Sequence, residues 1–213
     1  MSANEVIFTV RLSNYYLFVK RPVEVALALS MLLATWPLWL VVAVAIKVDS
    51  PGPIIHVQRR LGRHGVPFRF YKFRTMVVGA ERHLDQLRRH SDVDGPVFKM
   101  RNDPRVTRVG RFLRRSSIDE LPQLINVLRG DMSLVGPRPP LSSEAKLYRK
   151  SDWIRLAVKP GLTSLWAVNG RSRCSFEEWM RYDRDYIEKM SLSLDTMILI
   201  QTVWVVLRGS GAY

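Results

Sequence analysis

The chain has 213 residues, with 33 Lys and Arg against 19 Asp and Glu, which leaves a formal charge of +14. This length fits one domain with or without an appendage, and the apolar fraction of 47% disfavours disordered, collagen-like and low-complexity chains. The single cysteine, Cys174, excludes a disulfide-stapled secreted scaffold and a cysteine zinc cluster. The charge predicts a polyanionic partner, which composition leaves open among nucleic acid, an anionic membrane surface and a phosphorylated substrate.

The first predicted element is an apolar segment, residues 25–46, which runs for 22 residues without a charge. As one straight helix it would measure roughly 33 Å, close to the thickness of a bilayer core. Pro37 lies near its middle and predicts a kink or a break, because proline removes a backbone hydrogen bond. Basic residues flank both ends, so the positive-inside rule gives no orientation. A bent re-entrant hairpin with both ends on the cytoplasmic face fits these facts, and a straight, proline-kinked transmembrane helix is the alternative.

The turn Ser-Pro-Gly-Pro at residues 50–53 marks the clearest boundary in the chain. We therefore expect three segments: an N-terminal lead (1–19), a re-entrant membrane anchor kinked at Pro37 (20–49) and a cytosolic, interfacial globular domain (50–213). The fold class expected for the domain is α/β, rich in helices and with few short strands.

Several elements are predicted after the turn. Residues 54–58 and 66–76 carry β-branched or aromatic residues with basic ones between, as in short strands. Helices are predicted at residues 80–90, at residues 121–129 with Gly130 at the end, after a capping box that begins at Ser175, and at residues 195–207. The last of these is too short to span a membrane and is expected to be buried or to lie in the interface.

Positive charge is concentrated in residues 56–115, where 16 Lys and Arg stand against 5 Asp and Glu. Anionic lipid head groups would account for part of this excess next to a membrane segment. Nucleic acid is not expected as a partner, because no helix-turn-helix, zinc-finger or RNP motif is visible.

The strongest candidate for chemistry is the cluster RFLRRSSIDELPQ at residues 111–123. Pro122 is tolerated only in the first turn of a helix, which makes Asp119 the natural N-cap, and this is the structural interpretation. The functional interpretation uses the same geometry, because a helix N-terminus favours an ionised carboxylate and the arginines upstream can hold a phosphate. An ionised aspartate in that setting is suited to act as a nucleophile or as a Mg²⁺ ligand.

Two further clusters place basic residues in rigid turns. The segment SLVGPRPP at residues 133–140 holds Arg138 between prolines, so the side chain loses little entropy when it binds an anion. The segments KPGLT (159–163) and NGR (169–171) each place a basic side chain beside a glycine turn. Plain structural turns explain each of these clusters equally well when they are taken singly.

Taken together and in order, the segments resemble one family. They are KRPVE, VDSPGPIIHVQRRLGRHGVPFRFYKFRTM, RRSSIDELPQLINVLRGDMSLVGPRPP, KPGLTSLWAVNGR and SLSLDTMILIQTVWVVLRGSGAY. The chain from Lys20 to Tyr213 is similar to the bacterial sugar transferases, the monotopic phosphoglycosyl transferases that initiate exopolysaccharide or O-antigen synthesis. The resemblance implies transfer of a sugar 1-phosphate from a UDP-sugar to undecaprenyl phosphate, release of UMP, and Mg²⁺ as cofactor. It also implies a re-entrant helix in the lipids of the inner membrane and a catalytic domain on the cytoplasmic face.

The resemblance assigns roles to individual residues. It implies that Asp119 is the nucleophile that forms an aspartyl phosphosugar intermediate and contacts the metal, and that Glu120 assists proton handling or metal positioning. The residues expected to bind phosphate or nucleotide are Lys72, Arg74, Arg114, Gln123, Arg138 and Arg171.

The sequence also departs from the family pattern. Ser164 and Ala167 stand where the family usually has Gly and Gln, which removes any polar contact made by the Gln side chain, and Glu24 replaces a frequent Asp. Many relatives carry a preceding multi-helix membrane region, so we expect this chain to be a short form or a truncation. Residues 94–100 and the GSGAY ending resemble hexose-transferring relatives, which favours galactose or glucose.

Two partner questions stay open at this stage. A homodimer is compatible with the sequence, which does not determine the oligomeric state. A membrane-anchored regulator or scaffold without catalytic activity, which binds acidic lipid or a partner enzyme, is the alternative to an enzyme.

Overall fold

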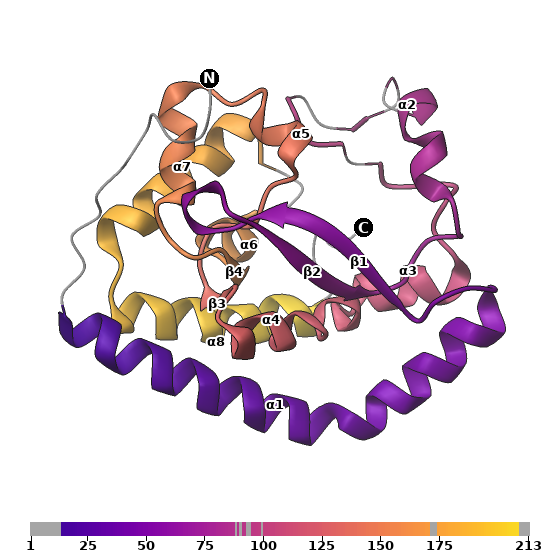
Figure 1. Ribbon diagram of the computed structural model, residues 1–213, viewed down its shortest axis with the longest axis horizontal. Coiled ribbons are helices and arrows are strands. Elements are labelled where there is room, and N and C mark those ends of the chain that lie inside the picture. The colour runs from indigo at the N-terminus through magenta and orange to yellow at the C-terminus, as the bar shows by residue number, and fades with distance from the viewer. Residues whose placement is uncertain are drawn as a thin grey trace.

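The longest element is α1 (Asn14–Asp49), which lies along one side of the molecule and bends near its middle (Figure 1). The structure is a computed structural model, and it describes residues 14–87, 89, 91–92, 95–98, 100–170 and 174–208. Pro37 lies inside the helix and has no N–H to donate to the carbonyl of Leu33. The hydroxyl of Thr35 donates to the carbonyl of Met31 at 2.7 Å, a bond that often accompanies helix bending. The predicted kink is therefore confirmed, although the helix continues through it and begins within the predicted lead.

Most of the apolar surface of α1 is uncovered. Among the residues that the structure describes, α1 is the helix long and apolar enough to cross a membrane, and little of its apolar stretch is buried within the protein. Its exposed large apolar residues include Val23, Leu33, Trp36, Leu40, Val41, Val44 and Val48. Such a surface is unfavourable in water and indicates contact with lipid.

Both arms of α1 pack on the same body. In the N-terminal arm (residues 14–36), Arg21 donates to the carbonyls of Val127 and Leu128 at 2.6 and 3.0 Å. In the C-terminal arm (residues 38–49), Asp49 accepts from the backbone N–H of Val109 at 3.0 Å. The two ends of the long helix are thus held on one side of the bend, against one folded unit.

Two small sheets form the β part of the fold. Strands β1 (Ile55–Leu61) and β2 (Pro67–Phe73) confirm the two predicted strands, and the structure pairs them as an antiparallel hairpin joined by the turn η2 (Arg63–Gly65). Strands β3 (Ser133–Val135) and β4 (Gly161–Thr163) pair in parallel. Their close approach requires glycine, because a Cβ atom on Gly161 would lie 2.1 Å from the backbone nitrogen of Gly136.

The remaining elements are helices and helical turns. They are η3 (Ala80–His83), α2 (Leu84–Leu87), α3 (Arg108–Arg115), η5 (Ile118–Glu120), α4 (Gln123–Arg129), α5 (Ser142–Ala145), η6 (Lys150–Leu156), α6 (Leu165–Asn169), α7 (Phe176–Lys189) and α8 (Leu192–Arg208). The predicted end of α4 at Gly130 is confirmed by its φ of 84°, and the capping box at Ser175 is present. The predicted helix at residues 80–90 is a 3₁₀ turn and one helical turn as far as Leu87, and residues 88 and 90 lie outside the described residues.

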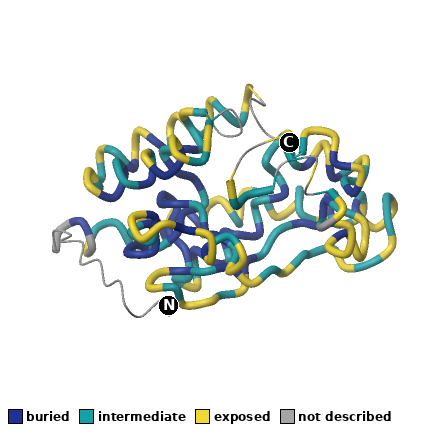
Figure 2. The backbone as a smooth tube through the Cα atoms, turned by 90° about the horizontal axis from the view of Figure 1, so that it is seen from above, coloured by how far each residue is buried: buried dark blue, intermediate teal, exposed yellow. Residues whose placement is uncertain are grey.

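The main core lies between α1, α4, β3, α7 and α8. It is built around buried apolar side chains that include Ala28, Leu124, Met132, Tyr186 and Ile198. The buried stretches gather in the interior of the molecule (Figure 2). Helix α8 buries Ile198 on one side and exposes an apolar face on the other. The first side fits the expected buried helix, and the exposed apolar face fits the expected interfacial helix.

Candidate active site

Asp119 and Glu120 lie on a 3₁₀ turn rather than at a helix cap. After α3 ends, Ser117 adopts a left-handed conformation with a φ of 57°, and η5 follows with both acidic residues. The N-cap position of α4 belongs to Pro122, so the expectation that Asp119 caps this helix is wrong. The reason is that one extra turn separates the carboxylates from α4. A non-glycine residue with positive φ is a conformation that functional sites often retain.

The two acidic residues line a cavity of about 1160 Å³. The cavity is bounded by the β1–β2 hairpin, α3, the loop after β3, α1 and α8. Seven basic side chains among the described residues line it: Arg60, Lys72, Arg74, Arg105, Arg114, Arg138 and Arg155. The positive charge that the sequence concentrates in residues 56–115 therefore reaches the carboxylates from several elements.

Burial dominates the ionisation of Asp119. It raises the pKa of this carboxyl to about 7, and the neighbouring Glu120 acts in the same direction. The positive charges of Lys72, Arg114 and Arg138 oppose the rise. A cation bound at this carboxylate would favour its ionised form further.

Lys72 on β2 is perturbed in the opposite sense. Burial lowers the pKa of its amine to about 8, and the charges of Arg60 and Arg114 lower it further, while Asp119 acts against them. Burial likewise lowers the pKa of Arg60 to about 10, with Arg138 adding to the effect. Crowded cations in a partly desolvated cavity form a site that an anion would stabilise.

Arg138 is held from two sides. Its Nη1 donates to Oε1 of Glu120 at 3.2 Å, and its carbonyl accepts from Arg155 at 3.0 Å. Arg155 is itself buried, paired with Asp183 at 2.8 Å and bonded to the hydroxyl of Tyr148 at 2.7 Å. The proline-bracketed loop therefore presents Arg138 to Glu120, on a support from Arg155 that the sequence did not indicate, and the anion-binding role expected for Arg138 stays a prediction.

Arg114 reaches the cavity because α3 packs tightly on the chain after β2. A Cβ atom on Gly110 would lie 2.1 Å from the carbonyl oxygen of Thr75, so only glycine permits this approach. The Nε of Arg114 then donates to the hydroxyl of Thr75 at 3.0 Å. Arg114 thereby lines the cavity that holds Asp119.

Three predicted site residues behave differently from this set. Arg74 lines the cavity, but its guanidinium donates to carbonyls at the end of α1, those of Pro51, of Ser50 at 2.7 Å and of Ile46 at 3.4 Å. These contacts give Arg74 a structural role and do not support the expected phosphate role. Gln123 is 2% exposed, and its Nε2 has no protein partner, so it has a donor to offer a ligand. Arg171 lies outside the described residues.

The sequence reasoning missed Arg60 as a site residue. Its guanidinium donates to the carbonyl of Pro139 at 2.7 Å and packs over the ring of Phe70 at 4.5 Å. It lies in the segment QRRLG, which the resemblance covers. Side chains alternate along a strand, so Arg60 and Gln58 share one face of β1, and this pattern was the signal in the sequence that could have placed Arg60 at the site.

The donor set is compatible with Mg²⁺. Within the described part of the chain no three His, Cys, Asp or Glu side chains are grouped to hold a metal. Mg²⁺ usually takes one or two carboxylates and completes its octahedron with water and substrate phosphates, which Asp119 and Glu120 suit. Asp103 also lines the cavity, but Arg105 holds its two oxygens at 2.6 and 2.9 Å.

Two of the three departures from the family pattern, Ser164 and Ala167, lie in or beside α6. The hydroxyl of Ser164 accepts from the backbone N–H of Ala167 at 3.1 Å and caps α6. Ala167 lines the cavity. The Gln side chain that the family usually has at this position is therefore replaced by a methyl group on the cavity wall.

Comparison with known proteins decides the family. Residues 15–209 match the family described as bacterial sugar transferase. The chain belongs to that family. It is 43% identical to the galactosyl transferase CpsE of Streptococcus agalactiae serotype III over 198 residues, and these residues are 92% of this chain and 44% of that protein.

Other relatives of the sugar transferase family extend the comparison. An undecaprenyl-phosphate galactose phosphotransferase of Salmonella typhimurium is 42% identical over 200 residues, which are 92% of this chain and 42% of that protein. The exopolysaccharide production protein ExoY of Sinorhizobium fredii is 38% identical over 198 residues, which are 91% of this chain and 88% of that protein. The chain thus spans less than half the length of the first two relatives and most of the third.

Proposed function

We propose that this protein transfers a sugar 1-phosphate from a UDP-sugar to undecaprenyl phosphate, as the first membrane step of exopolysaccharide, O-antigen or capsule synthesis. The observation that carries the proposal is the buried carboxylate of Asp119 in a cavity lined by basic side chains and continuous with exposed apolar helices. The names of relatives, among them an undecaprenyl-phosphate galactose phosphotransferase, support the same reaction.

The proposed chemistry has two displacements at one phosphorus. A carboxylate oxygen of Asp119 attacks the phosphorus that bears the sugar, the bond to the bridging oxygen breaks, and UMP leaves with that oxygen. The product is an aspartyl phosphosugar, an acyl phosphate. A phosphate oxygen of undecaprenyl phosphate then attacks the same phosphorus, and Asp119 leaves as a carboxylate, which gives undecaprenyl diphosphosugar.

Charge neutralisation is the main task of the surrounding residues. A carboxylate that approaches a diphosphate meets like-charge repulsion, and preorganised cations offset it in the transition state. We assign Lys72, Arg114 and Arg138 to the phosphates, and Glu120 to the orientation of Arg138, which it contacts at 3.2 Å. Asp119 and Glu120 would hold Mg²⁺, which would supply further positive charge for the phosphates.

The acceptor requires a site at the level of the lipid head groups. We propose that α1 enters and leaves the inner membrane from the cytoplasmic face, because its two arms pack on the same folded body. A straight transmembrane helix would separate its two ends by the bilayer and could not make both sets of contacts.

For the donor we propose a hexose, with galactose and glucose as the first to be tried. Two relatives carry galactose in their names, and a third, from Xanthomonas campestris, is a UDP-glucose:undecaprenyl-phosphate glucose-1-phosphate transferase. A relative from Aeromonas hydrophila is named for N-acetylgalactosamine, so this sugar belongs in the same screen.

The test is the variant Asp119→Asn, assayed for UMP release with UDP-sugars, undecaprenyl phosphate and Mg²⁺. We expect at least about a thousandfold loss of activity, because the amide is no nucleophile, with membrane association unchanged. Asp185→Asn on α7 is the control and should retain activity. Undiminished turnover of Asp119→Asn would refute the nucleophile assignment, and absence of UMP release by the unaltered protein with every sugar would favour a non-catalytic regulator.

A further inference from the structure

The cavity that holds Asp119 does not end at the basic side chains. It extends along α1 and α8 to a set of largely apolar residues: Leu27, Met31, Thr35 and Leu38 of α1, and Leu199, Thr202, Val203, Val206 and Leu207 of α8. We name this extension the helix slot. One end of the cavity is therefore cationic, and the other end is hydrocarbon.

The two helices are joined at one end of the helix slot. Lys20 of α1 and Asp195 of α8 form an ion pair at 2.6 Å, and Ala28 and Ile198 are buried in the same core cluster. Beyond these residues both helices line the cavity, and they run along the same side of the molecule (Figure 1). From Leu199 to Leu207 the wall formed by α8 is about 12 Å long at the rise of an α-helix.

The helix slot is open to the surroundings and offers them hydrocarbon. Val203 and Leu207 are 59% and 74% exposed, and Leu27 and Met31 are 42% and 40% exposed. The hydroxyls at the slot are already bonded within the protein, that of Thr35 to the carbonyl of Met31 and that of Thr202 to the carbonyl of Ile198, each at 2.7 Å. The slot therefore presents methyl and methylene groups and few free donors.

We infer that the helix slot holds the hydrocarbon tail of the lipid phosphate acceptor and guides its phosphate to Asp119. This inference rests on the proposed function and adds the path of the acceptor. An anionic head on a long apolar chain matches a cavity that is basic at one end and apolar at the other, and the exposed apolar faces of α1 and α8 place the opening in lipid.

Matched substitutions on each helix test the inference. On α8, Val203→Trp fills the slot, whereas Ile200→Trp alters a residue of similar exposure, 57%, that does not line the cavity. On α1, Leu27→Trp fills the slot, and Leu29→Trp, at a position 48% exposed and outside the cavity, is the control. The second pair keeps the test decisive if one variant does not fold.

The kinetic readout separates the acceptor from the donor. We expect Val203→Trp and Leu27→Trp to raise the KM for undecaprenyl phosphate about tenfold, the loss expected from one or two methylenes of burial. The KM for the UDP-sugar and the exchange of labelled UMP into UDP-sugar without acceptor should stay unchanged, because the first displacement does not use the slot. Equal acceptor KM values in slot and control variants, or a parallel loss of exchange, would overturn the inference.

A crosslinking readout does not depend on activity. With p-benzoyl-phenylalanine at Val203, light should attach undecaprenyl phosphate added to phospholipid nanodiscs, and at Ile200 it should attach mainly phospholipid. Equal adducts at both positions would show that the slot binds bulk lipid only and would overturn the inference. If the Val203 adduct forms while the unaltered protein releases no UMP, the slot stands and the proposed reaction fails.

Discussion

At the residue scale, the decisive property of the site is the competition between burial and charge. Burial raises the pKa of Asp119 to about 7 and lowers that of Lys72 to about 8, so each group is moved toward its neutral form. A bound diphosphate would favour the charged form of the lysine. The site is therefore suited to accept an anion, because a bound anion offsets the cost of burying a positive charge at Lys72.

Lys72 gives a pH dependence with a defined sign. Its depressed pKa means that the free protein loses this positive charge as the pH rises through about 8, so kcat/KM for the UDP-sugar should fall above that value. In Lys72→Arg the charge persists, and the alkaline limb should move to higher pH whatever the height of the profile. The measurement is kcat/KM from pH 6 to 10, and a limb that stays near pH 8 in the variant would assign it to another group.

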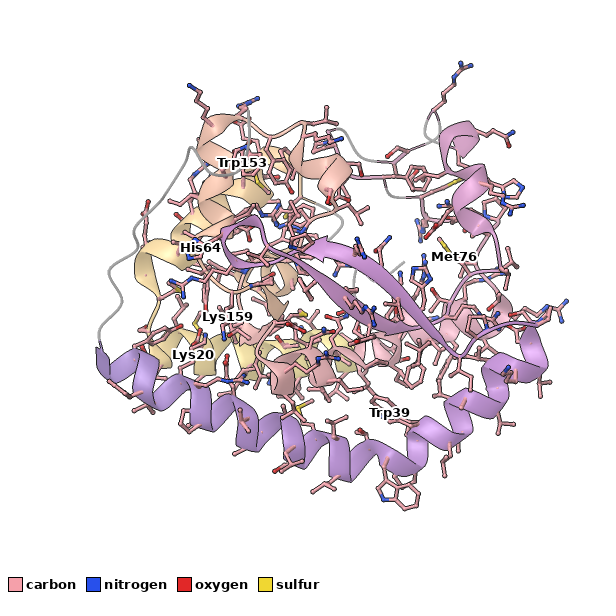
Figure 3. The ribbon with its side chains drawn as sticks, in the orientation of Figure 1. Lys20, Trp39, His64, Met76, Trp153 and Lys159 are labelled. Atoms are coloured by element: carbon pink, nitrogen blue, oxygen red, sulfur yellow. The ribbon has the colours of Figure 1, made fainter. Side chains whose placement is uncertain are left out.

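At the element scale, the bend in α1 decides how the two arms of this helix meet the folded body. Pro37 removes one backbone bond, but the bend is useful only because both arms find partners on the same body. Val42 and Ile46 of the C-terminal arm share a core cluster with Phe73 and Leu113. Figure 3 shows Lys20 and Trp39, one on each arm, against the same folded unit.

The topology of α1 can be tested with thiol labels near its two ends. Cysteines placed at Phe18 and at Lys47, both exposed, should resist an impermeant reagent in intact spheroplasts and react after lysis, because the proposed re-entrant arrangement puts both positions on the cytoplasmic face. The native Cys174 is replaced by serine in both variants. Labelling of either site in intact spheroplasts would contradict the re-entrant arrangement and favour a helix that crosses the membrane.

At the scale of the whole molecule, a polar network joins the start of α1 to the loop that carries Arg138. Lys20 donates to Asp195 at 2.6 Å and to the carbonyl of Val135 at 3.2 Å, and the hydroxyl of Tyr186 donates to the same carbonyl at 3.0 Å. Val135 precedes the turn that carries Arg138, so the anchor, α7 and α8 meet directly behind a residue of the site.

Breaking this network should destabilise the whole protein. Lys20→Met leaves Asp195 buried without its cation, and we expect the free energy of unfolding to fall by about 3 kcal/mol. The double variant Lys20→Met, Asp195→Leu should recover part of the loss, because the carboxylate of Asp195 is then absent and only Glu24, which lies 3.5 Å from Lys20, has lost an ion-pair partner. Lys189→Met, at an exposed position on α7, should change stability by less than about 0.5 kcal/mol. Unfolding in nanodiscs measures all three, and an equal effect of Lys20→Met and Lys189→Met would contradict the role of the network.

Features that depend on neighbouring residues were readable from the sequence. The kink at Pro37, the hairpin strands, the end of α4 at Gly130 and the capping box at Ser175 follow from local dihedral preferences and local hydrogen bonds. The rigid loop that carries Arg138 was also recognisable, because its prolines fix the backbone locally, whereas the 3₁₀ turn that carries Asp119 and Glu120 was not expected.

The partners of long side chains were decided only by the tertiary structure. The sequence treated Arg74 as a phosphate ligand and missed Arg60 and Arg155, because an arginine bonds whichever carbonyl or carboxylate the fold brings within reach. The helix slot likewise joins residues 27–38 to residues 199–207, which no local pattern relates. Local geometry is encoded over a few residues, whereas a cavity exists only where segments distant in sequence leave space between them.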